Sequence, residues 1–184
     1  MKNRSIFAAL AMLAMTSGLL LSGCGGADNT KTNVNGAPSN QTPAQTKPAS
    51  IPKGAPLPDN AFKAVINATN APATLTAGQQ ATVSVRLRNG SDVAWPAAGD
   101  QDGKYQVKLG NHWLDARSQP VVVDDGRTPL PADLQPGAEI ELPLIVTAPA
   151  KPGDYILQLD IVQENVAWSG DKGNNTFKVK VQVK

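Results

Sequence analysis

The last eight residues read Phe177-Lys178-Val179-Lys180-Val181-Gln182-Val183-Lys184, with an apolar side chain at every second position. Neighbouring side chains of a β-strand point to opposite faces, so this pattern predicts a strand with one apolar face and one polar face. Three earlier stretches alternate in the same way, with their apolar positions at Val83/Val85/Leu87, Ile140/Leu142/Leu144/Val146 and Tyr155/Leu157/Leu159/Ile161. Four strands that each bury one face predict antiparallel sheets packed face to face.

Shorter apolar stretches predict further strands over residues 62–67, 93–95, 105–109, 112–116 and 121–123. Turn-forming pairs such as Asn89-Gly90 separate the strands, and no long stretch has the 3.6-residue period of a core helix. About seven to nine short strands over residues 60–184 are typical of an immunoglobulin-like antiparallel β-sandwich. The sequence therefore predicts an all-β domain, in which Tyr155, just after Pro152-Gly153-Asp154, is expected to form a tyrosine corner.

Residues 1–23 have the features of a secretory signal peptide. Lys2 and Arg4 precede an apolar run from Ile6 to Leu21, and small residues follow it. The run is shorter than the roughly 20 residues that a membrane-spanning helix needs, which disfavours the alternative of an uncleaved helical anchor.

The residues at the end of this run, Leu21-Ser22-Gly23-Cys24, resemble the lipobox of bacterial lipoproteins. The resemblance implies cleavage before Cys24, a diacylglyceryl thioether on its sulfur and N-acylation with a fatty acid such as palmitate. Two or three acyl chains would hold the protein on a lipid bilayer. Gly25 stands where an Asp would signal inner-membrane retention, so the expected location is the bacterial cell envelope, at the outer membrane where one exists. In the alternative, an ordinary secreted protein, Cys24 would be an unpaired reactive thiol.

Residues 24–59 differ in composition from the rest of the chain. After Cys24 they contain six Pro and many Asn, Gln, Thr, Ala and Gly residues, with few large apolar side chains. Such a segment cannot bury enough apolar surface to offset the entropy lost on ordering. The sequence predicts a disordered tether between the lipidated Cys24 and a folded domain over residues 60–184.

Charge and composition exclude several functions. Residues 1–23 carry two basic and no acidic side chains, so the mature chain has 15 basic and 15 acidic residues and no dense basic run that would bind nucleic acid. His112 is the only His, and the three Met residues lie in the signal peptide, so a zinc or copper site is not expected. No nucleophile motif accompanies His112, so neither catalysis nor a cofactor is expected. Acidic residues of the kind that bind Ca²⁺ occur at Asp100, Asp102, Asp124 and Asp125, but no EF-hand loop is completed.

A set of short motifs resembles the four-tryptophan immunoglobulin-like domain of autophagy receptors and its bacterial relatives. These motifs are Leu87-Arg88-Asn89, Val93-Ala94-Trp95-Pro96, Asn111-His112-Trp113-Leu114-Asp115, Asp125-Gly126-Arg127-Thr128-Pro129-Leu130-Pro131, Leu134-Gln135-Pro136-Gly137 and Val166-Ala167-Trp168. The match covers roughly residues 80–183. It implies a non-catalytic recognition domain, often found on polysaccharide-related envelope proteins. This chain has three Trp residues where the receptor domain has four, so the resemblance does not carry over a complete binding pocket.

The three Trp residues are the strongest candidates for a core or a binding face. Trp95 is expected in the core. Trp113 and Trp168 are candidates for stacking against sugar rings, with Asp115 and Arg127 as polar partners for the hydroxyl groups. In the alternative interpretation, both Trp residues close the ends of the core and the charged residues form surface ion pairs.

The leading functional hypothesis is a membrane-anchored envelope lipoprotein whose immunoglobulin-like domain binds cell-envelope polysaccharide or, failing that, a protein. The alternative is a structural or assembly protein that docks onto a larger envelope complex. An exposed aromatic cleft would favour the first hypothesis, and a broad apolar patch would favour the second.

Overall fold

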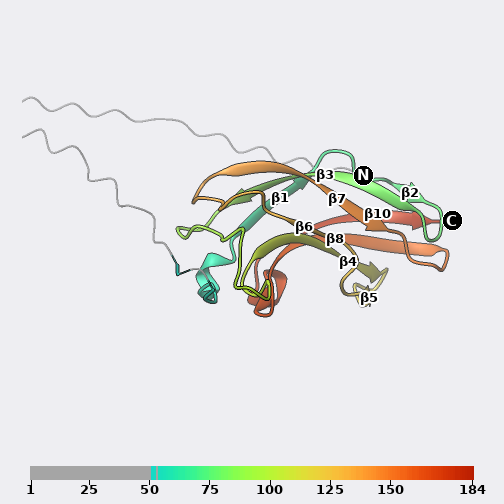
Figure 1. Cartoon of the computed structure of the whole chain (residues 1–184). Coiled ribbons are helices and arrows are strands. Elements are labelled where there is room, and N and C mark those ends of the chain that lie inside the picture. The colour runs from blue at the N-terminus through green and yellow to red at the C-terminus, as the bar shows by residue number, and fades with distance from the viewer. Residues whose placement is uncertain (1–50, 53) are drawn as a thin grey trace, which may run out of the picture. The chain divides into compact units, whose positions relative to one another are not determined.

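The computed structural model describes residues 51–52 and 54–184. The predictions for the signal peptide, for Cys24 and for the tether up to residue 50 lie outside the described residues. Two sheets of strands form the domain (Figure 1), which confirms the predicted all-β, immunoglobulin-like sandwich. No helix in the part of the chain that the structure describes combines the length and the apolar character required to cross a membrane.

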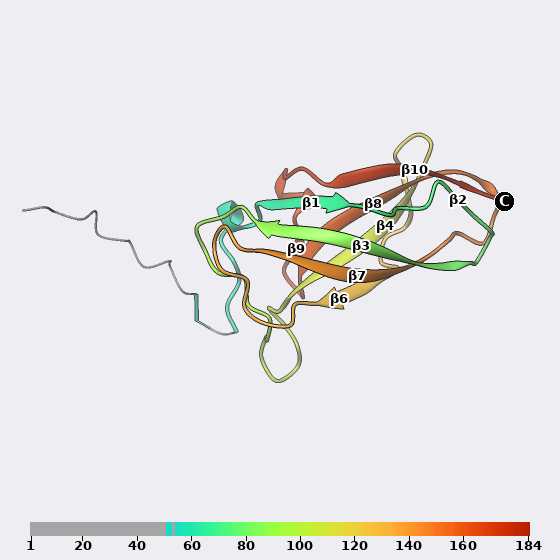
Figure 2. The same ribbon diagram turned by 90° about the horizontal axis from the view of Figure 1, so that it is seen from above.

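The smaller sheet has three antiparallel strands in the order β1-β3-β7. The larger sheet has seven strands, with the main order β2-β10-β8-β4-β5, while β6 pairs with β4 and β9 pairs with β8. Viewed from above, β1, β3 and β7 lie over the larger sheet (Figure 2). The strands are β1 (Ala64–Ala68), β2 (Thr74–Leu75), β3 (Gln80–Asn89), β4 (Val107–Asp115), β5 (Pro120–Val122), β6 (Arg127–Pro129), β7 (Glu139–Thr147), β8 (Gly153–Gln163), β9 (Ala167–Trp168) and β10 (Phe177–Val183), and the short 3-10 helices are η1 (Asp59–Ala61) and η2 (Gly170–Lys172).

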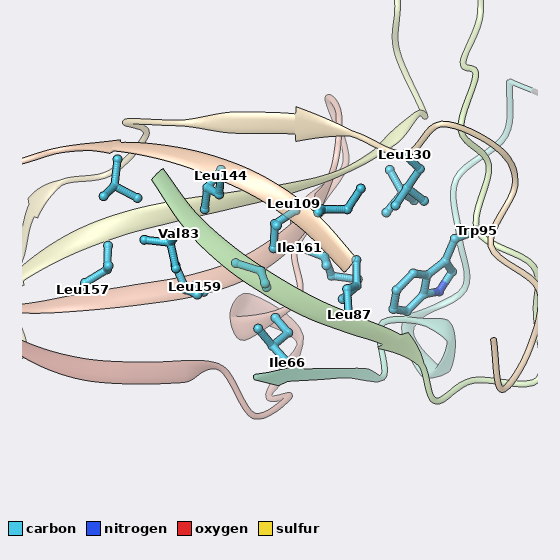
Figure 3. Close-up of a cluster of buried hydrophobic side chains, with 14 of the residues drawn as sticks. Ile66, Val83, Leu87, Trp95, Leu109, Leu130, Leu144, Leu157, Leu159 and Ile161 are labelled. Carbon is cyan, nitrogen blue, oxygen red and sulfur yellow. The ribbon is translucent and has the colours of Figure 1, made fainter. Parts of the chain in front are cut away.

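The alternating residues that predict the sheets fill the space between them. Val83 and Leu87 of β3 face Leu109 of β4 and Leu159 of β8 in one buried cluster (Figure 3), and all four side chains are fully buried. The opposite positions of β3 are exposed or partly exposed, whereas on the outer face of the larger sheet several of them, including His112, Asp160 and Val162, are buried. The Tyr155 hydroxyl donates a hydrogen bond of 2.9 Å to the carbonyl of Lys151, which confirms the tyrosine corner.

Strand β4 differs from its prediction. The sequence predicts two strands separated at Gly110-Asn111, whereas β4 runs without interruption and pairs with β8 over its whole length. Asn111 is fully buried, and its side chain accepts a hydrogen bond from the Gly126 amide and donates one to Asp125. A polar residue that usually marks a turn is used here inside the domain, so the expected break is absent.

The folded domain also begins earlier than predicted. Leu57, assigned to the tether over residues 24–59, is only 4% exposed, and its amide donates a 2.7 Å hydrogen bond to the side-chain oxygen of Gln163. The buried Gln163 amide group in turn donates to the carbonyls of Ala55 and Tyr105. Because a buried amide must find partners for both its oxygen and its nitrogen, these bonds attach residues 55–57 to the domain.

Candidate functional site

Two of the three tryptophans belong to the core. Trp95 is fully buried, and its indole nitrogen donates a 2.8 Å hydrogen bond to the carbonyl of Ala61, which confirms its predicted place. Trp113 is also fully buried and meets Tyr155 edge-to-face at 6.4 Å between ring centroids. A ring with no exposed face cannot stack on a ligand, so the predicted binding role of Trp113 is wrong and the alternative core role applies to it.

The Trp113 indole nitrogen donates to Asp125, which connects the two sheets. The same carboxylate oxygen of Asp125 accepts hydrogen bonds from the Trp113 indole at 3.1 Å and from the Thr147 amide of β7 at 2.7 Å. The next residue, Gly126, occupies a position with no room for a side chain, because a Cβ there would lie 2.0 Å from the Ile145 carbonyl oxygen. The Asp125-Gly126 motif is therefore structural and joins β4 to the edge of the smaller sheet.

The other acidic residues considered as calcium ligands have separate structural partners. One Asp100 oxygen accepts hydrogen bonds from the amides of Asp102 and Lys104 and closes a turn. Asp124 is paired with Arg127.

Asp115, predicted as a ligand partner, closes the turn between β4 and β5. One of its carboxylate oxygens accepts hydrogen bonds of 2.8 Å from the amides of both Arg117 and Gln119. This is the usual way in which an Asp side chain stabilises a turn. The structure thus assigns Asp115 to the β4–β5 turn and does not bring it together with Trp168 and Arg127.

Trp168 lies on the outer face of the larger sheet and is partly exposed. The ring packs on Gly110 of the neighbouring β4, where an added Cβ would lie 2.8 Å from the indole atom Cη2. The ring also meets His112 at 4.1 Å between centroids, and the Arg127 guanidinium carbon lies 4.6 Å from the indole centroid. The structure therefore brings together Trp168 and Arg127, two of the four predicted site residues.

The contacts of Arg127 show that it holds the indole in place. Its guanidinium makes two 2.8 Å hydrogen bonds to Asp124 and a 2.9 Å ion pair with Glu164, which also pairs with Lys108 at 3.0 Å. The hydrogen bonds from Arg127 lower the pKa of Asp124, and those to Asp124 raise the pKa of Arg127. Nη1 of Arg127 is buried and has no hydrogen-bond partner among the described residues beyond its ion-pair contact with Glu164. Because Nε and Nη2 bond to Asp124 and Nη1 is buried, Arg127 supports the Trp168 ring and is not presented to a ligand.

A depression of about 380 Å³ lies beside Trp168 on this outer face. Its floor comes from β4, β8 and β10, one wall from the β4–β5 hairpin, and the other wall from Trp168 and the segment that follows it. Its volume is within the usual range for small-ligand sites, about 300–1,000 Å³. The lining residues are His112, Leu114, Ser118, Pro120, Val123, Gln158, Asp160, Trp168, Gly170, Asp171, Asn174, Thr176 and Lys178.

Asp160 holds the Trp168 segment against the floor of this depression. The side chain is 1% exposed, and its two oxygens accept hydrogen bonds of 2.8 Å from the amides of Ile161 and Gly170. Burial disfavours the charged carboxylate and raises the pKa of Asp160 to about 6. Since both oxygens are held by the backbone, Asp160 positions the segment and is not offered to a ligand.

His112 forms the aromatic side of the depression next to Trp168. Its ring nitrogen Nδ1 bonds to the Val123 carbonyl, and because a carbonyl only accepts, Nδ1 carries the proton. Burial lowers the pKa of His112, so the ring is neutral at pH 7. His112 is therefore a hydrogen-bonded residue of β4, and its ring also borders the depression.

Sequence reasoning missed the polar residues of the depression. Gln158 of β8 and Lys178 of β10 occupy the outward positions of the alternating strands, and they lie directly opposite each other in the strand register. The two-residue period shows that they face outward. It does not show which outward residues line the depression, because that depends on where the β4–β5 hairpin and the Trp168 segment lie beside the sheet.

The fold and this site together define an immunoglobulin-like domain with an aromatic-walled depression on the outer face of its larger sheet. No family model and no curated protein matches the sequence.

Among solved structures, the chain is similar to a mutant β-glucosidase from Listeria innocua in complex with laminaribiose, with 17% identity and a TM-score of 0.43. That match covers 66% of this chain and only 16% of the glucosidase chain. The chain is also similar to the CARDB domain of the PF1109 protein from Pyrococcus furiosus in complex with di-metal ions, with 16% identity and a TM-score of 0.39, over 66% of this chain and 86% of that one.

Proposed function

We propose that the chain is a lipoprotein of the bacterial cell envelope, and that its immunoglobulin-like domain binds envelope polysaccharide without catalysis. Cys24 would carry the lipid, and the depression beside Trp168 would bind the sugar. The observation that carries this proposal is the partly exposed Trp168 ring, which Arg127 and His112 hold at the edge of a depression with polar side chains on its floor.

The chemistry of the depression suits a saccharide. An aromatic ring offers an apolar face to the C–H groups of a sugar, while its hydroxyl groups need partners that donate or accept hydrogen bonds. Gln158, Asn174 and Thr176 provide such uncharged groups around the depression. The aromatic and polar parts of the lining therefore correspond to the two parts of a sugar ring.

The exposed apolar side chains give less support to a docking protein. Among the described residues the large apolar side chains exposed to solvent are Val65, Val121, Val123 and Ile145. They lie on or next to three different strands, β1, β5 and β7, and two of these strands belong to the smaller sheet. A protein interface usually presents its apolar residues as one contiguous patch, so polysaccharide remains the preferred partner.

The contacts of Asp160 support the proposal that the domain binds without catalysis. Cleavage of a glycosidic bond usually needs two carboxyl groups that reach the substrate, one of them with a raised pKa. Asp160 has the raised pKa, but its carboxylate is buried and both of its oxygens bond to backbone amides. Asp171 is then left as the other acid of the depression, without a partner for general acid–base work.

The binding site is tested by Trp168→Ala. A stacked Trp at a binding site contributes about 2 kcal/mol, so we expect affinity for envelope polysaccharide to fall about 30-fold in a pull-down or calorimetric titration. Arg88→Ala, on the outer face of the smaller sheet, is the matched control and should bind as the parent does. Equal binding by the parent and Trp168→Ala would contradict the proposed site.

The anchor is tested separately by Cys24→Ala. This variant cannot form the thioether, so the protein should accumulate as uncleaved precursor or without lipid, measured by gel mobility and by carbonate-washed membrane fractions. A product of normal size that remains on the washed membrane would contradict the lipoprotein proposal.

A further inference from the structure

A second depression of about 460 Å³ lies further along the same outer face. It is lined by Ala73, Ala116, Asp154, Tyr155, Ile156, Lys180, Val181 and Gln182. Most of these residues come from β8 and β10, the two strands that also form the floor of the depression beside Trp168. The second depression therefore lies on the strands that carry the first.

The strand register shows that the two depressions are neighbours. Gln158 pairs with Lys178 in the first depression, and Ile156 pairs with Lys180 in the second. Residues two positions apart on a strand face the same way and are about 6.6–6.8 Å apart. The two cross-strand pairs are two positions apart, so the first depression and the second are adjacent along β8 and β10.

Together the two depressions are longer than a single sugar. On β8 they extend from Asp154 to Asp160, which corresponds to about 20 Å of extended strand. β10 lies beside β8 along this length (Figure 2) and supplies Lys178, Lys180 and Gln182. We call the residues that line the two depressions along β8 and β10 the row. A ligand that contacts both ends of this row has to be an extended chain.

The charges along this row cancel. Its exposed charged side chains are Lys178, Lys180, Asp154 and Asp171, two of each sign. None of these four forms an ion pair with another residue of the 54–184 segment. A polyanion would meet the two carboxylates, and a polycation would meet the two ammonium groups, at a cost in either case. Hydroxyl groups both donate and accept hydrogen bonds, so an uncharged saccharide satisfies side chains of both signs.

We propose that the two depressions form one extended site, which binds an uncharged linear polysaccharide lying along β8 and β10. The inference rests on the proposed function and specifies its ligand. Sugar units near Trp168 would stack on the aromatic wall, while units further along would bond to Lys180, Asp154 and Gln182.

The test is a calorimetric titration of the full-length protein with saccharides of increasing length. The probes are neutral homo-oligomers of glucose, mannose and N-acetylglucosamine with two to six units, and oligogalacturonates of the same lengths as acidic counterparts. We expect one neutral series to bind, with the six-unit chain about tenfold or more tighter than the two-unit chain, because only the longer chain reaches both depressions. The acidic series should bind more weakly at equal length.

Variants at the far end separate the extended site from the near one. Lys180→Gln and Asp154→Asn should reduce the affinity for the six-unit chain to nearly that for the two-unit chain, and leave the two-unit chain unaffected. Lys63→Gln, an exposed lysine just before β1, is the matched control and should bind both chains as the parent does.

The outcomes distinguish this inference from the proposed function. An affinity that does not grow with length, or a preference for the acidic series, would overturn the extended neutral site while leaving saccharide binding intact. If no saccharide binds and extended peptides bind instead, both the proposed function and this inference are wrong.

Discussion

The interior between the two sheets and the outer face of the larger sheet use the same kinds of residue for different purposes. Trp113 lies inside, where its indole fills space and bonds to Asp125, a partly buried residue whose carboxylate also accepts a hydrogen bond from the backbone. Trp168 and Asp160 lie toward the outer face, where the indole remains partly exposed and the carboxylate holds the segment that carries it. The comparison indicates that residue type and spacing alone do not distinguish a core tryptophan from one that is partly exposed on an outer face. The decisive difference is which face of the sheet the side chain occupies.

The largest expected effect comes from the interior. Trp113→Ala removes a fully buried ring and leaves the Asp125 carboxylate without one of its donors. We expect the free energy of unfolding to fall by about 3–5 kcal/mol, measured by chemical denaturation. If the variant unfolds at the same denaturant concentration as the parent, the ring is not part of the core and the comparison fails.

The beginning of the domain is the next test of what belongs to the interior. A chain that starts at Asp59 lacks the buried Leu57 and leaves Gln163 without two of its backbone partners. We expect it to lose about 3 kcal/mol of unfolding free energy relative to a chain that starts at Ser50. Equal stability of the two chains would show that residues 54–58 are dispensable for the fold.

The pH dependence of stability tests the outer face. The pKa of Asp160 is raised from 3.8 in the unfolded chain to about 6 in the folded domain, so the folded state binds the proton more tightly. The contribution of this group to the unfolding free energy therefore increases as the pH falls, by about 2 kcal/mol between pH 7 and pH 4.5.

His112 acts in the opposite direction. Its lowered pKa means that the unfolded state takes up a proton first, so its contribution is lost as the pH falls below about 6.5. The effect of Asp160 is therefore measured as the difference between the parent and Asp160→Asn over this pH range. Parallel pH profiles for the two proteins would contradict a buried, charged Asp160 at neutral pH.

The sheets could be predicted because two-residue alternation directly determines which side chains are buried. Val83, Leu144 and Leu157 all lie in the core where the pattern predicts them. The continuous β4 and the early start at Leu57 could not be predicted, because they depend on contacts between residues far apart in the sequence. Asn111 reads locally as a turn residue and is satisfied only by the distant Gly126 and Asp125.

The candidate site was predictable only in part. The sequence identified Trp168 and Arg127, and the structure places them in contact. It also grouped Trp113 and Asp115 with them, although Trp113 faces the opposite side of β4 from His112 and Asp115 closes a turn. Gln158 and Lys178 belong to the depression because the β4–β5 hairpin and the Trp168 segment form its walls beside them, and no local pattern encodes that arrangement.

The central claim is that one tryptophan of the three meets the ligand, and ¹⁹F NMR of the protein labelled with 5-fluorotryptophan tests it most directly. The three residues give three resonances, which are assigned by changing each Trp to Phe in turn. On titration with the neutral oligosaccharides, we predict that the Trp168 resonance shifts while those of Trp95 and Trp113 remain in place. A Trp168 resonance that stays unchanged throughout the titration, or a shift confined to the buried Trp95 and Trp113, would contradict the account.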